Sequence, residues 1–404
     1  MKYEMKKVFS KRSSQIALLL ILALLGVVSY LAVNITYVDG DGNKIKGPAA
    51  AVKLKEAQKE WAGCLDEEKL RQAIAENRRI KQSAQYRSKE LKDNEIAYSW
   101  GQGVQGIRDL LNCAFAKGFQ DYDYYRADSL TESDAADFYS NRIQLLKSWL
   151  SKEASEQFSD SQKAYLVSQY EKLQVPFSID YMLGWRQAVE YAPTVVMLLA
   201  LILGYLVAGI FSGEFSWRAD AVFFSSAYGR NRAVRDKIKA GLGIVTGIYA
   251  AVFILYTCFV LLCLGADGAG LPVQASWTSW KSFYHMTVWQ EYLAIAIGGY
   301  LGCLFLALLT MLVSAKTKSA VLAVMVPFLA IFLPTFLQGV NHPAVTKVTG
   351  LLPDQLLQVG MVVRYFHLYE IGGKVVGALP ILLVLYLVLA AVLVPVIDRG
   401  YRKL

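Results

Sequence analysis

Histidines and cysteines are the residues of this sequence that could bind a metal or act as nucleophiles. The three histidines are His285, His342 and His367. His367 and Glu370 would share one helix face if their segment were helical, which makes a metal site there one interpretation. Histidines that only form hydrogen bonds at a surface are more common, so we expect no metal site in this chain.

The acidic segment at Asp39 has the spacing of the start of a calcium-binding loop. Asp39, Asp41 and Asn43 occupy the first three ligand positions. Lys44, however, stands where such a loop needs glycine, and Ala50 stands where it needs glutamate. A tight turn or a small hairpin at Asp-Gly is therefore the better prediction.

Motifs for nucleotide or peptidase chemistry are missing. The sequence has no G-x-x-x-x-G-K-[ST] loop, no G-x-G-x-x-G that follows a predicted strand, and no H-E-x-x-H. We therefore expect no enzymatic activity and no cofactor in this chain.

The segment 212–239 combines aromatic residues with cations. The aromatic residues are Phe215, Trp217, Phe223, Phe224 and Tyr228, and the cations include Arg218, Arg230 and Lys237. One interpretation is a basic loop beside a membrane, with an interfacial helix. The other is a docking surface for a protein partner, since aromatic and arginine anchors are favoured at such surfaces.

Long stretches without charge flank the segment 212–239 and indicate that it lies between membrane spans. The chain of 404 residues is 55% hydrophobic and only 19% charged, with a mean hydropathy of +0.33. A helix of about 20 apolar residues crosses the hydrocarbon core of a bilayer. Six such helices are predicted, at 15–34, 191–212, 240–264, 291–314, 319–338 and 375–397.

The loops between the spans differ in charge. Lysines and arginines concentrate in four segments on one side of the six-span arrangement, at 1–14, 213–239, 315–318 and 398–404. The positive-inside rule makes this side cytoplasmic, and the net charge of +9 reflects that orientation. The first span begins like a signal peptide, but its apolar run is long, so we expect an uncleaved anchor.

These spans predict an all-α, multi-pass protein of the cell membrane with both termini in the cytoplasm. Residues 1–14 would form an amphipathic elbow, 213–239 a cytoplasmic coupling segment, and 398–404 a cytoplasmic tail. A large domain, 35–190, and the loops 265–290 and 339–374 would lie outside. The last loop contains a possible interfacial helix, or else a flap that packs on the external domain.

The external domain 35–190 is predicted to be mainly helical, because apolar residues recur three and four apart. Thr131 and Asp134 have the spacing of a capping box. Basic and acidic residues nearly balance, so the domain has no footprint for nucleic acid. Its many aromatic residues are predicted to form a core, with a ligand-binding surface as the alternative.

Cys64 and Cys113 are the only cysteines of the external domain. A disulfide between them is possible, because disulfides persist outside the cytoplasm. The alternative is that both are free thiols that serve as small buried residues. Cys258, Cys263 and Cys303 lie in predicted spans and are expected to be packing residues.

Two pairs of glycines indicate close helix packing. Gly243 and Gly247 lie in the third predicted span, and Gly298 and Gly302 lie in the fourth. Small residues at this spacing let the backbones of two helices approach closely.

Around 212–239 the sequence resembles the permeases of the type-2 exporter family of ABC transporters. The similar residues are Glu214, the stretch Ala221–Ser226, Arg230 and Lys237, whereas Ala227-Tyr228-Gly229 replaces the usual Pro-x-Ser. The resemblance implies a coupling helix that docks on a separate cytoplasmic ABC ATPase, which binds ATP and Mg²⁺. It also implies a dimer of two six-span permeases, either identical or paralogous.

The expected function is therefore that of the permease subunit of an ATP-driven exporter. Phe215, Arg218, Phe223 and Phe224 would contribute to the coupling surface with Glu214, Arg230 and Lys237. The predicted spans have no charge in their interiors, unlike those of ion-coupled pumps, which favours a hydrophobic compound or a peptide as cargo. A membrane receptor or sensor with a ligand-binding external domain and a membrane-embedded enzyme are the alternatives.

Overall fold

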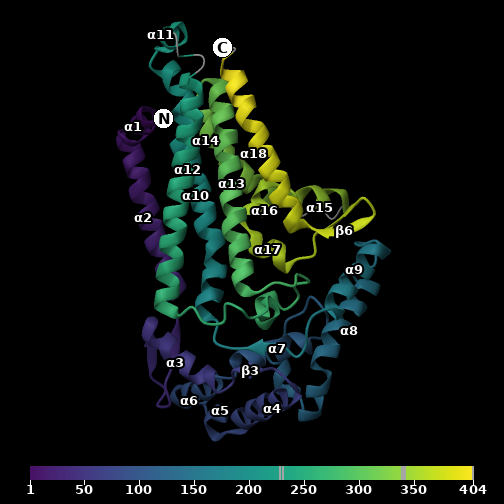
Figure 1. Cartoon of the computed structure of the whole chain (residues 1–404). Helices are drawn as coiled ribbons and strands as arrows, with labels where there is room; N and C mark the ends of the chain where they lie inside the picture. The colour runs from purple at the N-terminus through teal and green to yellow at the C-terminus, as the bar shows by residue number, and fades with distance from the viewer. Residues whose placement is uncertain (227–228, 230–231, 338–342, 403–404) are drawn as a thin grey trace.

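The computed structural model describes residues 1–226, 229, 232–337 and 343–402. Within these residues, five helices are long and apolar enough to cross a membrane. They are α2 (Arg12–Val33), α10 (Leu183–Ser216), α12 (Arg232–Leu264), α13 (Val288–Thr317) and α18 (Ala378–Arg402). They lie side by side as one bundle (Figure 1), so the prediction of a mainly helical, multi-pass membrane protein is confirmed.

The segment predicted as the fifth span is shorter than the other membrane helices. The α-helix α14 (Ala320–Phe332) has 13 residues and continues as the 3-10 helix η5 (Leu333–Leu337). Pro327 lies inside α14, and Pro334 lies in η5, where it removes a backbone donor and favours the change of helix type. Six full spans are therefore not confirmed.

The helices α10 and α13 occupy the centre of the bundle. Helix α10 packs against α2, α12, α13 and α14, and α13 also packs against α18. Close approach to α14 requires a glycine, because a Cβ built on Gly204 would lie 2.6 Å from Cγ of Pro327. The short helix α1 (Lys2–Phe9) crosses the end of this bundle and contacts α2, α10 and α12.

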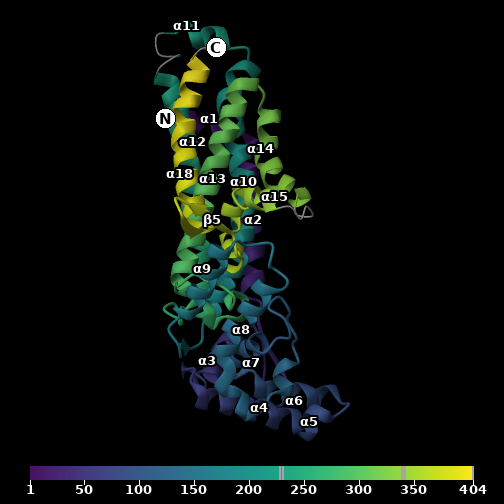
Figure 2. The ribbon, with the colours of Figure 1, turned by 90° about the vertical axis from the view of Figure 1, so that its right-hand side faces the viewer.

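Both chain ends and the short helix α11 (Asp220–Ser225) lie at the same end of the bundle (Figures 1 and 2). The domain that follows α2 lies at the opposite end (Figure 1). The basic segments predicted from the sequence therefore gather at one end of the molecule. We call this end the α11 end, and the other the domain end.

The domain is built from short helices with small two-stranded sheets. Its helices are α3 (Pro48–Lys59), α4 (Glu67–Gln82), α5 (Ala84–Arg87), α6 (Leu91–Gly101), α7 (Gln105–Ala114), η1 (Arg126–Ser129), η2 (Glu132–Asp137), α8 (Phe138–Ser151) and α9 (Asp160–Glu171). The strands are β1 (Thr36–Val38), β2 (Lys44–Lys46), β3 (Gly63–Cys64) and β4 (Ser178–Ile179). Strands β3 and β4 pair antiparallel and join the two ends of the domain.

Two local predictions for this domain are confirmed. Strands β1 and β2 form an antiparallel hairpin in which Thr36 faces Lys46, and Oδ1 of Asp39 accepts from the backbone N–H groups of Asp41 and Asn43. The carboxylate of Asp39 therefore shapes a turn. Thr131 and Asp134 form the predicted capping box at the start of η2.

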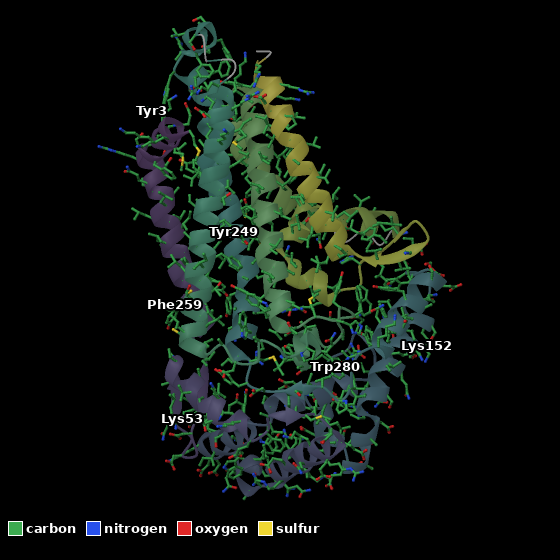
Figure 3. All side chains as sticks on the ribbon, viewed as in Figure 1. Tyr3, Lys53, Lys152, Tyr249, Phe259 and Trp280 are labelled. Carbon is green, nitrogen blue, oxygen red and sulfur yellow. The ribbon has the colours of Figure 1, made fainter. Side chains whose placement is uncertain are left out.

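The loop between α12 and α13 completes the core of the domain. It contains η3 (Val273–Ala275) and η4 (Trp277–Ser279), and the Trp280 ring packs beside Phe138 and Phe177. Buried Arg142 donates to the carbonyl oxygens of Trp280 and Ser282 at 3.3 and 3.0 Å. Figure 3 shows Trp280 where the domain meets the membrane helices. The loop is therefore part of the domain.

The segment after η5 contains helices and a hairpin. The helices are α15 (Pro343–Thr349), α16 (Pro353–Leu357) and α17 (Val359–Arg364), and the strands are β5 (Leu368–Ile371) and β6 (Lys374–Gly377). Glu370 lies in β5, so the helix face proposed for His367 and Glu370 is wrong. The Glu370 carboxylate accepts from Oγ of Ser159 and Ser161, which joins the hairpin to the domain.

Gly298 and Gly302 of α13 pack against the short helices α17 and α16, and not against another long helix. A Cβ on Gly298 would collide with Cγ2 of Val359, and one on Gly302 would lie 2.7 Å from Cδ2 of Leu357. In α12, Gly243 lies near the Met1 side chain, whereas a Cβ on Gly247 would meet no described atom within 4 Å. Gly298 and Gly302 thus lie in close contact with their neighbours, while Gly247 faces open space.

The two sets of glycines give a matched test of this packing. Gly298→Leu should lower the free energy of unfolding by about 1–3 kcal/mol or more, because added atoms must displace α17. Gly247→Leu should change it little, because its side chain enters open space. Thermal unfolding of both variants in detergent measures the difference. Equal destabilisation would show that α17 does not depend on this contact.

Candidate functional site

A buried ion pair joins α10 to α12 at the α11 end. The ammonium group of Lys237 lies 2.8 Å from both carboxylate oxygens of Glu214, and it donates to the carbonyl oxygen of Ile210 at 2.6 Å. Lys237 is 1% exposed and Glu214 is 5% exposed. Charges buried this deeply are tolerated because each has its opposite charge and further hydrogen-bond partners.

Helix α1 adds a second ion pair to the first. Lys7 Nζ lies 3.3 Å from Oε1 of Glu214 and 3.2 Å from Oε1 of Glu4, while Lys237 lies 3.3 Å from Oε2 of Glu4. Positive and negative charges therefore alternate around a cluster, which we call the ion cluster. It holds three helices together where α11 emerges from α10.

Aromatic rings pack beside the ion cluster. The buried Tyr401 near the end of α18 donates its hydroxyl to the carbonyl oxygen of Phe211 at 3.1 Å. The rings of Phe215, Phe223 and Phe224 have centroids 6.2, 6.2 and 5.4 Å from that of Tyr401. These rings connect α11 to the ends of α10 and α18.

The segment 212–239, predicted as a docking surface, is partly buried in the structure. Glu214 and Lys237 are buried, and the rings of Phe215, Phe223 and Phe224 are half-buried against Tyr401. Arg218 is exposed and has a φ of 55°, which turns the chain from α10 into α11. Arg230 lies outside the described residues.

Two apolar side chains of this segment are exposed. Val222 on α11 is 74% exposed, and Trp217 just before it is 58% exposed, with Nζ of Lys11 lying 5.5 Å from its ring. Helix α11 lies at the tip of the molecule (Figures 1 and 2). Val222 and Trp217 are thus exposed apolar side chains at this tip, while Phe223 and Phe224 of α11 pack beside Tyr401.

A cavity of about 1650 Å³ lies at the domain end. Its wall includes parts of the domain, the first residues of α10, the loop between α12 and α13, and the segment from α15 to β5. Six of its aromatic lining residues are Trp61, Tyr98, Phe119, Tyr122, Trp149 and Trp277. The alternative of a ligand surface among the aromatics of the domain therefore has a physical location.

Charged residues line the same cavity. Arg364 at the end of α17 forms an ion pair with Glu190 of α10, at 3.1 Å. Asp109 accepts from Nε2 of Gln105 at 2.6 Å, and burial raises the pKa of this carboxyl group. Asp354 at the start of α16 is 2% exposed, and burial raises its pKa to about 6.

Asp354 and Arg364 each carry a buried polar atom without a hydrogen-bond partner among the described residues. These atoms are Oδ1 of Asp354 and Nε of Arg364. The other oxygen of Asp354 accepts from Nε2 of Gln355 at 2.9 Å. Neither residue is among those that the sequence predicts to have a function. The signal that could have found Asp354 is a carboxylate beside a proline within an apolar run.

The possible disulfide between Cys64 and Cys113 is not formed, because both cysteines are free. Cys64 is exposed in β3, whereas Cys113 is buried in α7, where burial raises its pKa to about 12. Of the cysteines in spans, Cys303 is buried as expected and Cys258 is exposed. Among the described residues, no group of histidines, cysteines and carboxylates could hold a metal ion, and His342 lies outside them.

The ion cluster predicts an asymmetry between single and double substitutions. Lys237→Leu should destabilise the protein by about 3 kcal/mol or more, because the carboxylate of Glu214 stays buried and loses its closest cation. Adding Glu214→Leu should recover most of that loss. Lys239→Leu, at an exposed position of the same helix, is the control. Chemical unfolding of the three variants measures the effect, and a double variant as unstable as Lys237→Leu would contradict it.

Burial of Asp354 predicts a pH dependence. Its pKa is raised from the ordinary value of 3.8 to about 6, so the folded state binds this proton more tightly than the unfolded chain does. The contribution of Asp354 to stability therefore decreases as the pH rises from about 4 to about 6, and then stays constant. Asp354→Asn should raise the melting temperature at pH 7.5 relative to wild type, but not at pH 4. An equal effect at both pH values would contradict this.

Protein-family models, curated proteins and solved structures contain no match to this chain. A proposal of function therefore rests on two features of the structure. These are the α11 tip, which packs on the ion cluster and Tyr401, and the cavity at the opposite end.

Proposed function

We propose that this chain is the permease subunit of an ATP-driven exporter. A separate ABC ATPase, which binds ATP and Mg²⁺, would dock at the α11 end, and that end would face the cytoplasm with both termini. A second permease, identical or paralogous, would complete the transporter in the cell membrane. The domain end would then face outward, with its cavity on the outer side of the spans.

The observation that carries the proposal is the connection of the exposed α11 tip to the ion cluster. A partner that moved α11 would act through Phe223 and Tyr401 on α18, and through Glu214 and Lys237 on α10 and α12. Buried charges resist separation, because each would be left without its partner. Movement of α11 would therefore shift these helices together, as alternating access requires.

The cavity also fits a membrane receptor whose external domain binds a ligand. A receptor would need a signalling protein bound at the α11 end, just as an exporter needs its ATPase there. The two functions differ in the protein bound at that end. An ATPase with a phosphate-binding loop indicates an exporter, whereas a kinase or another signalling protein indicates a receptor.

A photo-crosslinking amino acid at position 222 tests which protein binds. Val222 is exposed on α11, and Val384, 63% exposed on α18, provides the control position. We expect crosslinking from position 222 to a protein with a G-x-x-x-x-G-K-[ST] sequence, identified by mass spectrometry, and no such product from position 384. Val222→Asp should weaken copurification of that ATPase at least tenfold without reducing membrane insertion.

A second measurement tests whether binding at α11 changes the rate of ATP hydrolysis. The wild-type chain in nanodiscs should change the ATPase rate of the captured protein, and the Val222→Asp chain should change it much less. If no ATP-binding protein is crosslinked from position 222, or if the variant couples normally, α11 is not the docking site for a motor.

A further inference from the structure

The lining of the cavity at the domain end is acidic. Six carboxylates line it, from Asp109, Asp121, Glu156, Asp180, Glu190 and Asp354. The cations in the lining are Arg186, Lys281, Lys347 and Arg364. The domain as a whole has nearly balanced charges, so the acidic excess is a property of the cavity wall.

Asp354 is a buried carboxylate of this wall, and no cation is among its partners in the described residues. The residue is 2% exposed, and its Oδ1 accepts no hydrogen bond from the described residues. A buried acceptor without a partner costs about 1–3 kcal/mol, and an ionised one costs more. The hydrogen-bond donors at the Asp354 carboxylate are the side-chain amide of Gln355 and the backbone N–H groups of Asp354 and Gln355, all of them neutral.

The position of Asp354 is fixed by the bundle. It lies in the first turn of α16, and α16 rests on α13, where Gly302 leaves room for Leu356 and Leu357. Nε of Arg364, one helix further along, also lacks a partner among the described residues and lines the same cavity. Adjoining helices of the wall thus carry a buried acceptor and a buried donor that have no partner among the described residues.

The size and the aromatic residues of the cavity narrow the class of ligand. Pockets for drug-sized molecules measure about 300–1,000 Å³, so about 1650 Å³ accommodates something larger. Rings from Trp61, Tyr122 and Trp277 offer apolar contact and can also attract cations. A ligand that satisfies this wall combines positive charge, apolar groups and amide donors and acceptors.

We propose that the cavity binds a cationic amphipathic peptide, with one ammonium or guanidinium group of the peptide on the Asp354 carboxylate and its apolar side chains against the aromatic wall. Backbone carbonyl groups of the peptide would accept from Arg364. This inference rests on the proposed function, because it names the class of cargo that the exporter would carry. A phospholipid fits less well, because its phosphate would enter a wall rich in carboxylates.

Direct binding to the purified full chain tests this inference without the ATPase. The chain is placed in nanodiscs of neutral phosphatidylcholine, and energy transfer from its tryptophans to dansyl-Lys-Phe-Lys-Phe-Lys-amide is titrated. The same peptide with acetylated lysines provides the uncharged comparison, and empty nanodiscs measure binding to lipid. We expect the charged peptide to bind at least tenfold more tightly than the acetylated one.

The Asp354→Asn variant should lose at least tenfold in affinity for the charged peptide and keep its affinity for the acetylated one. Asp160→Asn is the control, because that carboxylate is exposed on α9 and does not line the cavity. Glu190→Gln, at an exposed position of the cavity wall, should also weaken binding of the charged peptide. This second variant keeps the test decisive if Asp354→Asn does not fold.

Three outcomes would overturn the inference: equal affinity for the two peptides, no effect of either cavity substitution, or a signal explained by the empty nanodiscs. Displacement of the peptide by added phosphatidylethanolamine, with no charge preference among peptides, would indicate a lipid site instead. If the peptide does not bind but position 222 still crosslinks to an ATPase, only the proposed class of cargo is refuted. Binding here without an ATPase at α11 would refute the exporter and leave the peptide site standing.

Discussion

The ion pair between Lys237 and Glu214 is the interaction on which the organisation of the α11 end depends. Each charge is costly in an apolar bundle, so the two must remain together, and with them the helices that carry them. Lys7 and Glu4 extend the same requirement to α1. Apolar residues of similar size could give equal stability, but they would not define the register of three helices in the same way.

The domain end is organised by close packing of small residues. Gly298 and Gly302 remove side chains from one stripe of α13, and α16 and α17 occupy the space. Those two short helices then place Asp354 and Arg364 in the cavity wall. At the α11 end, each buried charge of the ion cluster has a partner of opposite charge. At the domain end, the buried side chains of Asp354 and Arg364 each have an atom without a hydrogen-bond partner among the described residues. A structural role needs matched charges, and a binding role benefits from unmatched ones.

The long membrane helices could be predicted from sequence because lipid allows few alternatives to an apolar helix. The fifth predicted span, 319–338, contains a shorter helix in the structure, because a count of its apolar residues gives no weight to Pro327 and Pro334. The burial of Glu214 and Lys237 was missed because a basic segment between spans resembles an exposed loop. The cavity could not be predicted, since its wall comes from segments as distant as Ile35 and Tyr369, which no local pattern connects.

The core of the domain contains residues that the ribosome makes much later than the domain itself. Trp280 and Ala275 belong to one cluster of buried residues with Phe138, while Phe283 and Leu368 belong to another with Trp149. Residues 35–190 therefore emerge from the ribosome before their own interior can be completed. The domain can complete its core only after the segment that contains Leu368 has been made, so its correct folding depends on the later part of the chain.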